Sequence, residues 1–154
     1  MPQFTTTHRV KHSAQNMYDL VADIERYPEF VPLCEGLVIK SKEDQGDKHI
    51  ILADMTVAYK LVRETFTSKV HMNAEKQEII TESVQGPFRN MKNSWRFKEA
   101  GEGRCDVEFT ISYEFRNFAL QILMGGLFEK VFRKFSGAFE ARADQIYGVP
   151  AREI

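Results

Sequence analysis

The segment from Val107 to Phe115 constrains the fold most strongly, because large apolar and polar residues alternate along it without a break. Apolar side chains stand at 107, 109, 111, 113 and 115, and polar ones stand between them. Successive side chains of a β-strand point to opposite faces, so the pattern predicts a strand with one dry and one wet face. An antiparallel sheet of this kind needs a cover for its dry face.

One segment is long enough to provide that cover. Residues 117–147 predict a helix roughly 45 Å long, at about 1.5 Å per residue. Steps of about 100° per residue gather its apolar side chains into one stripe. The stripe contains Leu120, Met124, Phe128, Val131, Phe132, Phe135, Ala138, Phe139 and Ile146, and the opposite side carries Glu129, Arg133, Glu140 and Asp144.

The beginning of the chain predicts a strand followed by a short helix. Residues 4–11 are rich in threonine and predict the strand. Ser13 is a suitable N-cap, and apolar residues follow it at helical spacing. Pro28 and Pro32 prevent that helix from continuing, so residues 26–32 predict a compact turn.

Period-two patterns predict the remaining strands, at residues 37–42, 51–59, 61–72, 78–84, 91–97 and 107–115. We therefore expect a single α+β domain over residues 1–154. Its curved antiparallel sheet of about seven strands wraps round one long C-terminal helix, with a short helix after the first strand. This arrangement is a helix-grip architecture.

Composition excludes several classes of protein. Lys and Arg number 21 against 22 Asp and Glu, so the net charge of −1 does not attract the whole chain to nucleic acid or anionic lipid. Cys34 and Cys105 fit two reduced thiols that pack as small apolar groups. The first residues lack a secretory signal, and the apolar run at 118–128 is shorter than the roughly 20 residues of a membrane span. We expect a cytoplasmic protein whose contact with a membrane, if any, is peripheral and at the inner membrane.

The facing elements are rich in large, flexible or aromatic side chains, which leaves two interpretations open. These side chains either fill the core or line a cavity beneath the helix. A ligand site would be mostly apolar with a few placed polar groups. Glu64 and Asn93 share a face with apolar strand residues and are candidates for such groups, unless they lie at strand ends in water.

Phe118, Ile122 and Leu123 form an anomaly at the start of the long helix, because they lie outside its core stripe. Farther along the helix the same side carries charged residues. An apolar surface confined to one end indicates a gate, a membrane contact or a dimer interface.

Motifs for catalysis are missing. The four histidines are scattered, with no HExxH and no Cys/His cluster, so we expect no metal site and no cofactor. No GxSxG elbow, phosphate-binding loop or catalytic triad is recognisable. His71 lies near Glu75 and Glu78, which fits an acid–base pair or, equally, a solvated strand end.

Three segments carry a family resemblance. Residues 27–34 (YPEFVPLC), residues 86–97 (GPFRNMKNSWRF) and the strand at 107–115 leading into the long helix resemble the coenzyme Q-binding START-like family. This family belongs to the polyketide cyclase/dehydrase-type SRPBCC proteins. The resemblance spans nearly the whole chain, and it includes a bacterial branch of ribosome-association toxins.

The resemblance implies a hydrophobic tunnel that binds ubiquinone or a related isoprenoid lipid without catalysis, in support of respiratory quinone biosynthesis or delivery. The toxin branch implies instead binding to the large ribosomal subunit and a block of subunit joining. The superfamily also contains cyclase- and dehydratase-like enzymes, which is a fold-level analogy alone.

The resemblance and the strand and helix faces together predict the site residues, and no catalytic residue is among them. We expect the ligand to contact Phe30, Leu33, Met55, Trp95, Phe97, Tyr113, Met124, Phe128 and Phe132. We expect Phe118, Ile122 and Leu123 to form the tunnel mouth or a membrane contact. The toxin alternative draws on two basic groups, which are Lys130, Arg133 and Lys134 on the helix and Arg89, Lys92, Arg96 and Lys98 near the second motif.

Overall fold

Seven antiparallel strands form one sheet, in the order β1-β7-β6-β5-β4-β3-β2. The computed structural model describes residues 3–59 and 62–148, without the side chains of residues 59, 62, 127–129, 132, 133, 135 and 136. The strands are β1 (Gln3–Val10), β2 (Cys34–Gln45), β3 (Lys48–Tyr59), β4 (Val62–Asn73), β5 (Glu78–Gln85), β6 (Phe88–Glu99) and β7 (Cys105–Phe115). The helices are α1 (Ala14–Ala22), the 3₁₀-helix η1 (Ile24–Glu29) and α2 (Phe118–Tyr147).

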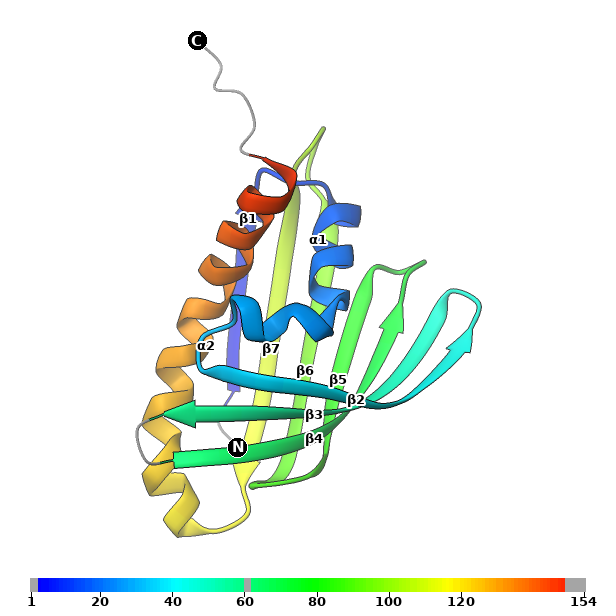
Figure 1. Ribbon diagram of the computed structural model, residues 1–154. Coiled ribbons are helices and arrows are strands. Elements are labelled where there is room, and N and C mark those ends of the chain that lie inside the picture. Colours follow the sequence, from blue (N-terminus) through cyan, green and yellow to red (C-terminus); the bar gives the residue numbers. More distant parts are fainter. Residues whose placement is uncertain (1–2, 60–61, 149–154) are drawn as a thin grey trace.

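The sheet is strongly curved, and its helices lie on the concave side (Figure 1). In this view β2, β3 and β4 run across the direction of β6 and β7, while α2 passes along the open side of the curve. β1 and β2 are the two edges of the sheet, so α1 and η1 carry the chain from one edge to the other. The α+β helix-grip prediction is confirmed.

Local sequence explains where the helices begin. The side chain of Ser13 accepts a hydrogen bond from the Asn16 backbone N–H at 3.1 Å and caps α1, as predicted. The side chain of Asn117 caps α2 in the same way through the Leu120 N–H at 2.9 Å. The predicted turn at 26–32 overlaps η1, so its first residues, including Pro28, continue a 3₁₀-helix that starts at Ile24.

The alternation that predicted β7 is confirmed. Its six odd-numbered residues, from Cys105 to Phe115, are buried, and the residues between them are half-buried. β7 pairs with β1 on one side and β6 on the other. It therefore lies inside the sheet, next to the edge strand β1, and both α1 and α2 contact it.

Gly86 explains why the second motif has its sequence. Its φ is +137°, a region that L side chains rarely adopt. A Cβ at this position would lie 3.0 Å from the carbonyl oxygen of Thr65 on β4. The glycine therefore shapes the backbone between β5 and β6.

Two details of the helix prediction were wrong. Ile146 was placed in the core stripe but is 48% exposed. Ile146 lies on the predicted side of α2, but it is not covered there. The last turn of α2 instead contacts α1, where the Tyr147 hydroxyl donates to the Asn16 carbonyl at 3.1 Å. Glu140 and Asp144 were expected to face solvent on the side away from the sheet, yet both bond to histidines from the beginning of the chain.

These histidine contacts tie α2 to β1 and to the turn that follows it. His8 Nε2 lies 3.0 Å from Glu140 Oε1, and His12 Nε2 lies 2.7 Å from Asp144 Oδ1. The two carboxylates are one helical turn apart, so both contacts fall on the same side of α2. The His12 ring is buried, which makes its pairing the better protected of the two.

Candidate functional site

An apolar cavity of about 140 Å³ lies between the concave face of the sheet, the segment joining η1 to β2, and α2. From β3 to β7 the lining residues alternate, as expected for one face of a sheet. They are Ala53, Met55 and Val57; Phe66, Ser68 and Val70; Ile79 and Thr81; Met91, Asn93 and Trp95; and Phe109 and Ile111. Phe88 of β6 also lines the cavity, and the register shift after it accounts for its even number. Tyr27, Val31, Leu33 and Cys34 close one side, and Val131 and Phe139 contribute from α2.

Three of the predicted contact residues, Leu33, Met55 and Trp95, line this cavity. Phe97, Tyr113 and Met124 are buried but do not border it. Phe30 packs beside the cavity against Phe139, with ring centroids 5.1 Å apart. The side chains of Phe128 and Phe132 lie outside the described residues.

The residues predicted for the mouth or a membrane contact are exposed. Phe118, Ile122 and Leu123 have exposed fractions of 77%, 68% and 59%. They begin α2, where Ala119 and Gly126 are also exposed. The prediction that these residues lie outside the core stripe of the helix is therefore confirmed. Whether they form a tunnel mouth or a membrane contact stays a prediction.

Of the two polar candidates, Asn93 lines the cavity and Glu64 does not. Sequence reasoning missed Ser68 and Thr81, which also line it. Each lies two residues from an apolar residue of its strand and therefore on the same face. These neighbours are Phe66 and Val70 for Ser68, and Ile79 for Thr81. This shared face was the available signal in the sequence. It did not identify Ser68 and Thr81 as site residues, because small hydroxyl residues are common in strands.

Phe139 holds α2 over the cavity. Its ring contacts Trp95 of β6 at 4.9 Å, Phe30 at 5.1 Å and Tyr27 of η1 at 5.4 Å between centroids, each edge to face. Aromatic pairs in this geometry contribute about 0.5–1.5 kcal/mol each beyond simple burial. One residue of α2 thus joins the helix to both the sheet and η1.

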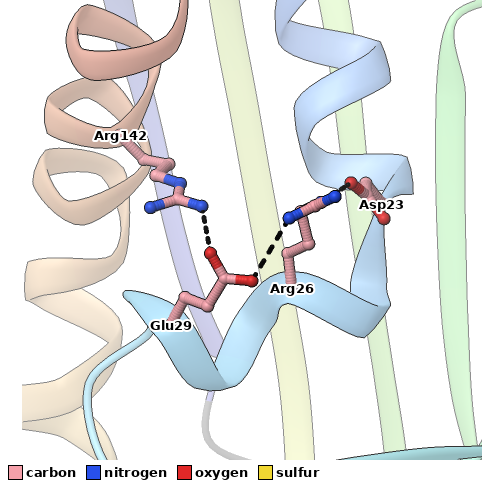
Figure 2. A network of polar contacts seen from close by, with 4 residues as sticks. All are labelled: Asp23, Arg26, Glu29 and Arg142. Atoms are coloured by element: carbon pink, nitrogen blue, oxygen red, sulfur yellow. Dashed lines mark hydrogen bonds and ion pairs between the residues drawn. The ribbon is translucent and has the colours of Figure 1, made fainter.

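A polar chain reinforces the same junction (Figure 2). Arg142 of α2 donates to Glu29 at 2.5 Å, and its guanidinium lies 5.2 Å from the centre of the Phe30 ring. Glu29 also accepts from Arg26, which pairs with Asp23. Arg26 and its partners are about half exposed and contribute little free energy. The contacts therefore serve mainly to orient η1 against α2.

The backbone of Leu33 is in an uncommon conformation, with a φ of +64°. The left-handed region costs an L-residue roughly 1–2 kcal/mol. The Leu33 carbonyl accepts from the Ala58 N–H of β3 at 3.1 Å, which holds this conformation in place. The result is that Leu33 lines the cavity at the start of β2.

The titratable groups at the cavity are held in their neutral forms. Burial raises the pKa of Tyr27 far above its ordinary value, and the Tyr27 hydroxyl donates to the Val21 carbonyl at 2.5 Å. Burial also raises the pKa of the Cys34 thiol to about 11. A thiol is nucleophilic as its thiolate, so Cys34 is a poor nucleophile near neutral pH.

Two further observations concern the part of the chain that the structure describes. Among the described residues, no group of three or more His, Cys, Asp and Glu side chains is arranged to hold a metal ion. Within residues 3–59 and 62–148, no helix is both long and apolar enough to cross a membrane.

Comparison with known families identifies the family of this chain. The family described as polyketide cyclase/dehydrase and lipid transport matches residues 10–140. The chain belongs to this family. The resemblance to START-like proteins is thereby confirmed, and an apolar cavity under a long helix agrees with a family whose description includes lipid transport.

Individual relatives carry names of different kinds, toxin and coenzyme Q-binding protein. The chain is 31% identical over 148 residues to the ribosome association toxin RatA of Escherichia coli K12, covering 96% of this chain and 90% of that protein. It is 30% identical over 139 residues to the mitochondrial coenzyme Q-binding protein COQ10 homolog B of Xenopus laevis, covering 88% of this chain and 55% of that protein. A START superfamily protein from Mycobacterium smegmatis shares the fold, with a TM-score of 0.79, 19% identity and coverage of 94% and 98%.

Cys34 provides a direct test of the cavity. Because burial raises its pKa to about 11, we expect slow alkylation at pH 8 and a rate that rises with each pH unit toward that value. An apolar molecule in the cavity should slow alkylation of Cys34 and leave Cys105, which does not line the cavity, unchanged. Peptide mass spectrometry measures both sites in one sample. Rapid alkylation of Cys34 at pH 7 would contradict the buried position.

Proposed function

We propose that this protein binds a hydrophobic small molecule, ubiquinone or a related isoprenoid lipid, in the cavity beneath α2 and does not transform it. The apolar cavity is the observation that carries the proposal. Of its lining, Ser68, Thr81 and Asn93 are the sheet residues with polar side chains that can reach a ligand. A mostly apolar pocket with a few placed polar groups is typical of small-molecule sites.

The volume favours a ligand with a ring-sized head. An apolar cavity of roughly 150 Å³ admits a benzene-sized molecule, and the cavity here measures about 140 Å³. A long isoprenoid tail does not fit within this volume, so the tail has to extend out of the cavity. The coenzyme Q-binding relative supports the choice of a quinone head.

The chemistry of the lining supports binding without catalysis. Tyr27 and Cys34 border the cavity, and burial favours the uncharged form of each. The Tyr27 hydroxyl already donates to the Val21 carbonyl. General acid–base catalysis near neutral pH needs a group whose pKa lies near that pH, which these two groups do not provide.

Filling the cavity should abolish binding. Ala53 is 4% exposed and lines the cavity, so Ala53→Leu places three more carbon atoms inside it. We expect wild type to bind a short-chain ubiquinone with quenching of its single tryptophan, Trp95, and Ala53→Leu to lose at least tenfold in affinity. Extraction and mass spectrometry of protein from a quinone-producing host gives a second readout.

Ala141→Leu is the matched control, because it makes the same change at an exposed position of α2. Its affinity should equal that of wild type, and thermal melting should show both variants folded. Unchanged quinone binding by Ala53→Leu would contradict the cavity as the binding site. No quinone in the extract and no quenching in wild type would contradict the proposed ligand.

We further propose that the apolar start of α2 contacts a lipid surface, where such a ligand resides. Phe118, Ile122 and Leu123 are exposed there, and the exposed Lys130 and Lys134 follow within four turns. Apolar side chains followed by lysines suit the boundary between acyl chains and anionic headgroups. Burying one Phe or Leu contributes about 1.5–3 kcal/mol.

The double substitution Ile122→Ser and Leu123→Ser should reduce co-sedimentation with liposomes about tenfold or more, since it removes two of the three side chains. Thermal stability should stay nearly unchanged because both side chains are exposed. Val38→Ser with Val84→Ser is the matched control, because these valines are similarly exposed, at 64% and 58%, on the sheet. Equal sedimentation of both double variants would contradict the lipid contact.

A second candidate function is ribosome binding, and the relatives named ribosome association toxin favour it. The basic groups give it partial support. On β6, Arg89, Arg96 and Lys98 are paired with Glu114, Glu78 and Glu108, which reduces their capacity for phosphate. Lys130 and Lys134 are exposed on α2, while the side chain of Arg133 lies outside the described residues.

Sucrose-gradient sedimentation of a lysate containing tagged protein separates the two candidates. Phosphate binding weakens steeply as salt rises. Co-migration with the large subunit that falls with salt, and that is lost in Lys130→Glu with Lys134→Glu, would make ribosome binding the primary function. We expect the protein to stay at the top of the gradient at low salt, as a quinone carrier would.

A further inference from the structure

Three polar side chains interrupt the apolar lining of the cavity, and they lie together on neighbouring strands. Thr81 of β5 stands directly opposite Asn93 of β6. Val70 of β4 stands opposite Thr81, so Ser68, two residues before Val70, is the diagonal neighbour of Thr81 on the same face. Opposite and diagonal positions in an antiparallel pair are close enough for side chains to act on one group.

Asn93 presents an unused acceptor to this row. The side chain is 9% exposed, and its Nδ2 donates to the Thr110 carbonyl of β7 at 3.0 Å. A carbonyl accepts and never donates, so this contact fixes which end of the amide faces β7. Within residues 3–59 and 62–148, no donor is bonded to the Asn93 Oδ1.

The other two side chains are also available to a ligand. The hydroxyls of Ser68 and Thr81 make no hydrogen bond to other described residues, and each can donate or accept. By contrast, the Tyr27 hydroxyl and the Cys34 thiol at the same cavity already donate to the carbonyls of Val21 and Gly36. Among the described residues, the row of Ser68, Thr81 and Asn93 thus gives the cavity acceptors as well as donors with free hydrogen-bonding capacity, beside the Trp95 indole N–H, which can only donate.

We propose that this row determines specificity for a ring that carries a hydroxyl group, a quinol or phenol in preference to a quinone. The inference rests on the proposed function, since it concerns the same cavity. A quinone offers acceptors alone, so it provides no donor for the Asn93 Oδ1. A ring hydroxyl donates to that oxygen and accepts from Thr81 or Ser68. A site built for a hydroxyl rejects the analogue that lacks it, because its own polar groups are then left unpaired.

Three probes with the same decyl tail test the inference on the purified full chain: a short-chain ubiquinone, its quinol kept under argon, and the quinol with both hydroxyls methylated. Titration with Trp95 fluorescence as the signal measures each affinity. We expect wild type to bind the quinol roughly tenfold more tightly than the quinone or the dimethyl ether. The ether cannot be oxidised to the quinone, so it separates hydrogen bonding from redox state.

Two variants locate the effect. Asn93→Leu should remove the preference for the quinol while keeping affinity for the ether. Because this change also takes the donor from the Thr110 carbonyl, Thr81→Val provides a variant that disturbs no described hydrogen bond. It should reduce the preference about threefold. Thr5→Val, at an exposed position of β1, is the matched control and should bind all three probes as wild type does.

Equal binding of the three probes by wild type would overturn this inference and leave the proposed function standing. A preference for the quinol that persists in folded Asn93→Leu and Thr81→Val would also overturn it. Failure of every probe to bind would overturn the proposed function and the inference together.

Discussion

The packing of Phe139 against Tyr27, Phe30 and Trp95 is the contact on which the rest of the structure depends. It joins α2, η1 and β6, which are far apart in sequence. Phe139 is 2% exposed, so its burial contributes about 1.5–3 kcal/mol, and each ring pair adds a further fraction. The polar contacts of Glu140, Arg142 and Asp144 hold α2 from its sides, and Phe139 packs its middle against the sheet and η1 above the cavity.

The cavity exists because short side chains occupy the middle of the concave face. Ala53 and Ser68 stand opposite each other on β3 and β4, and Thr81 lies on the next strand. Large rings such as Trp95, Phe66 and Phe109 surround these positions without filling them. The same arrangement makes the space apolar at its walls and polar along one row. A single packing pattern therefore sets both the size of the cavity and the polar groups that border it.

Much of this followed from the sequence, and the failures have physical reasons. The alternation in β7, the cap at Ser13 and the exposed start of α2 were predictable from local periodicity. Leu33, Met55 and Trp95 were predicted and line the cavity. Phe97 faces the same side as Trp95, but it packs on Tyr18 of α1, with ring centroids 6.1 Å apart. A strand pattern shows which face is dry without showing which helix covers each position.

The sequence by itself determined which residues face inward, because side-chain direction follows from the two periods of strand and helix. Only the tertiary structure decided which inward residues pack against other side chains and which border the cavity. That choice depends on the curvature of the sheet and on the register between strands. The same holds for the pairing of His8 with Glu140 and of His12 with Asp144, each 132 residues apart. Contacts at such separations arise from the path of the chain, which local periodicity does not contain.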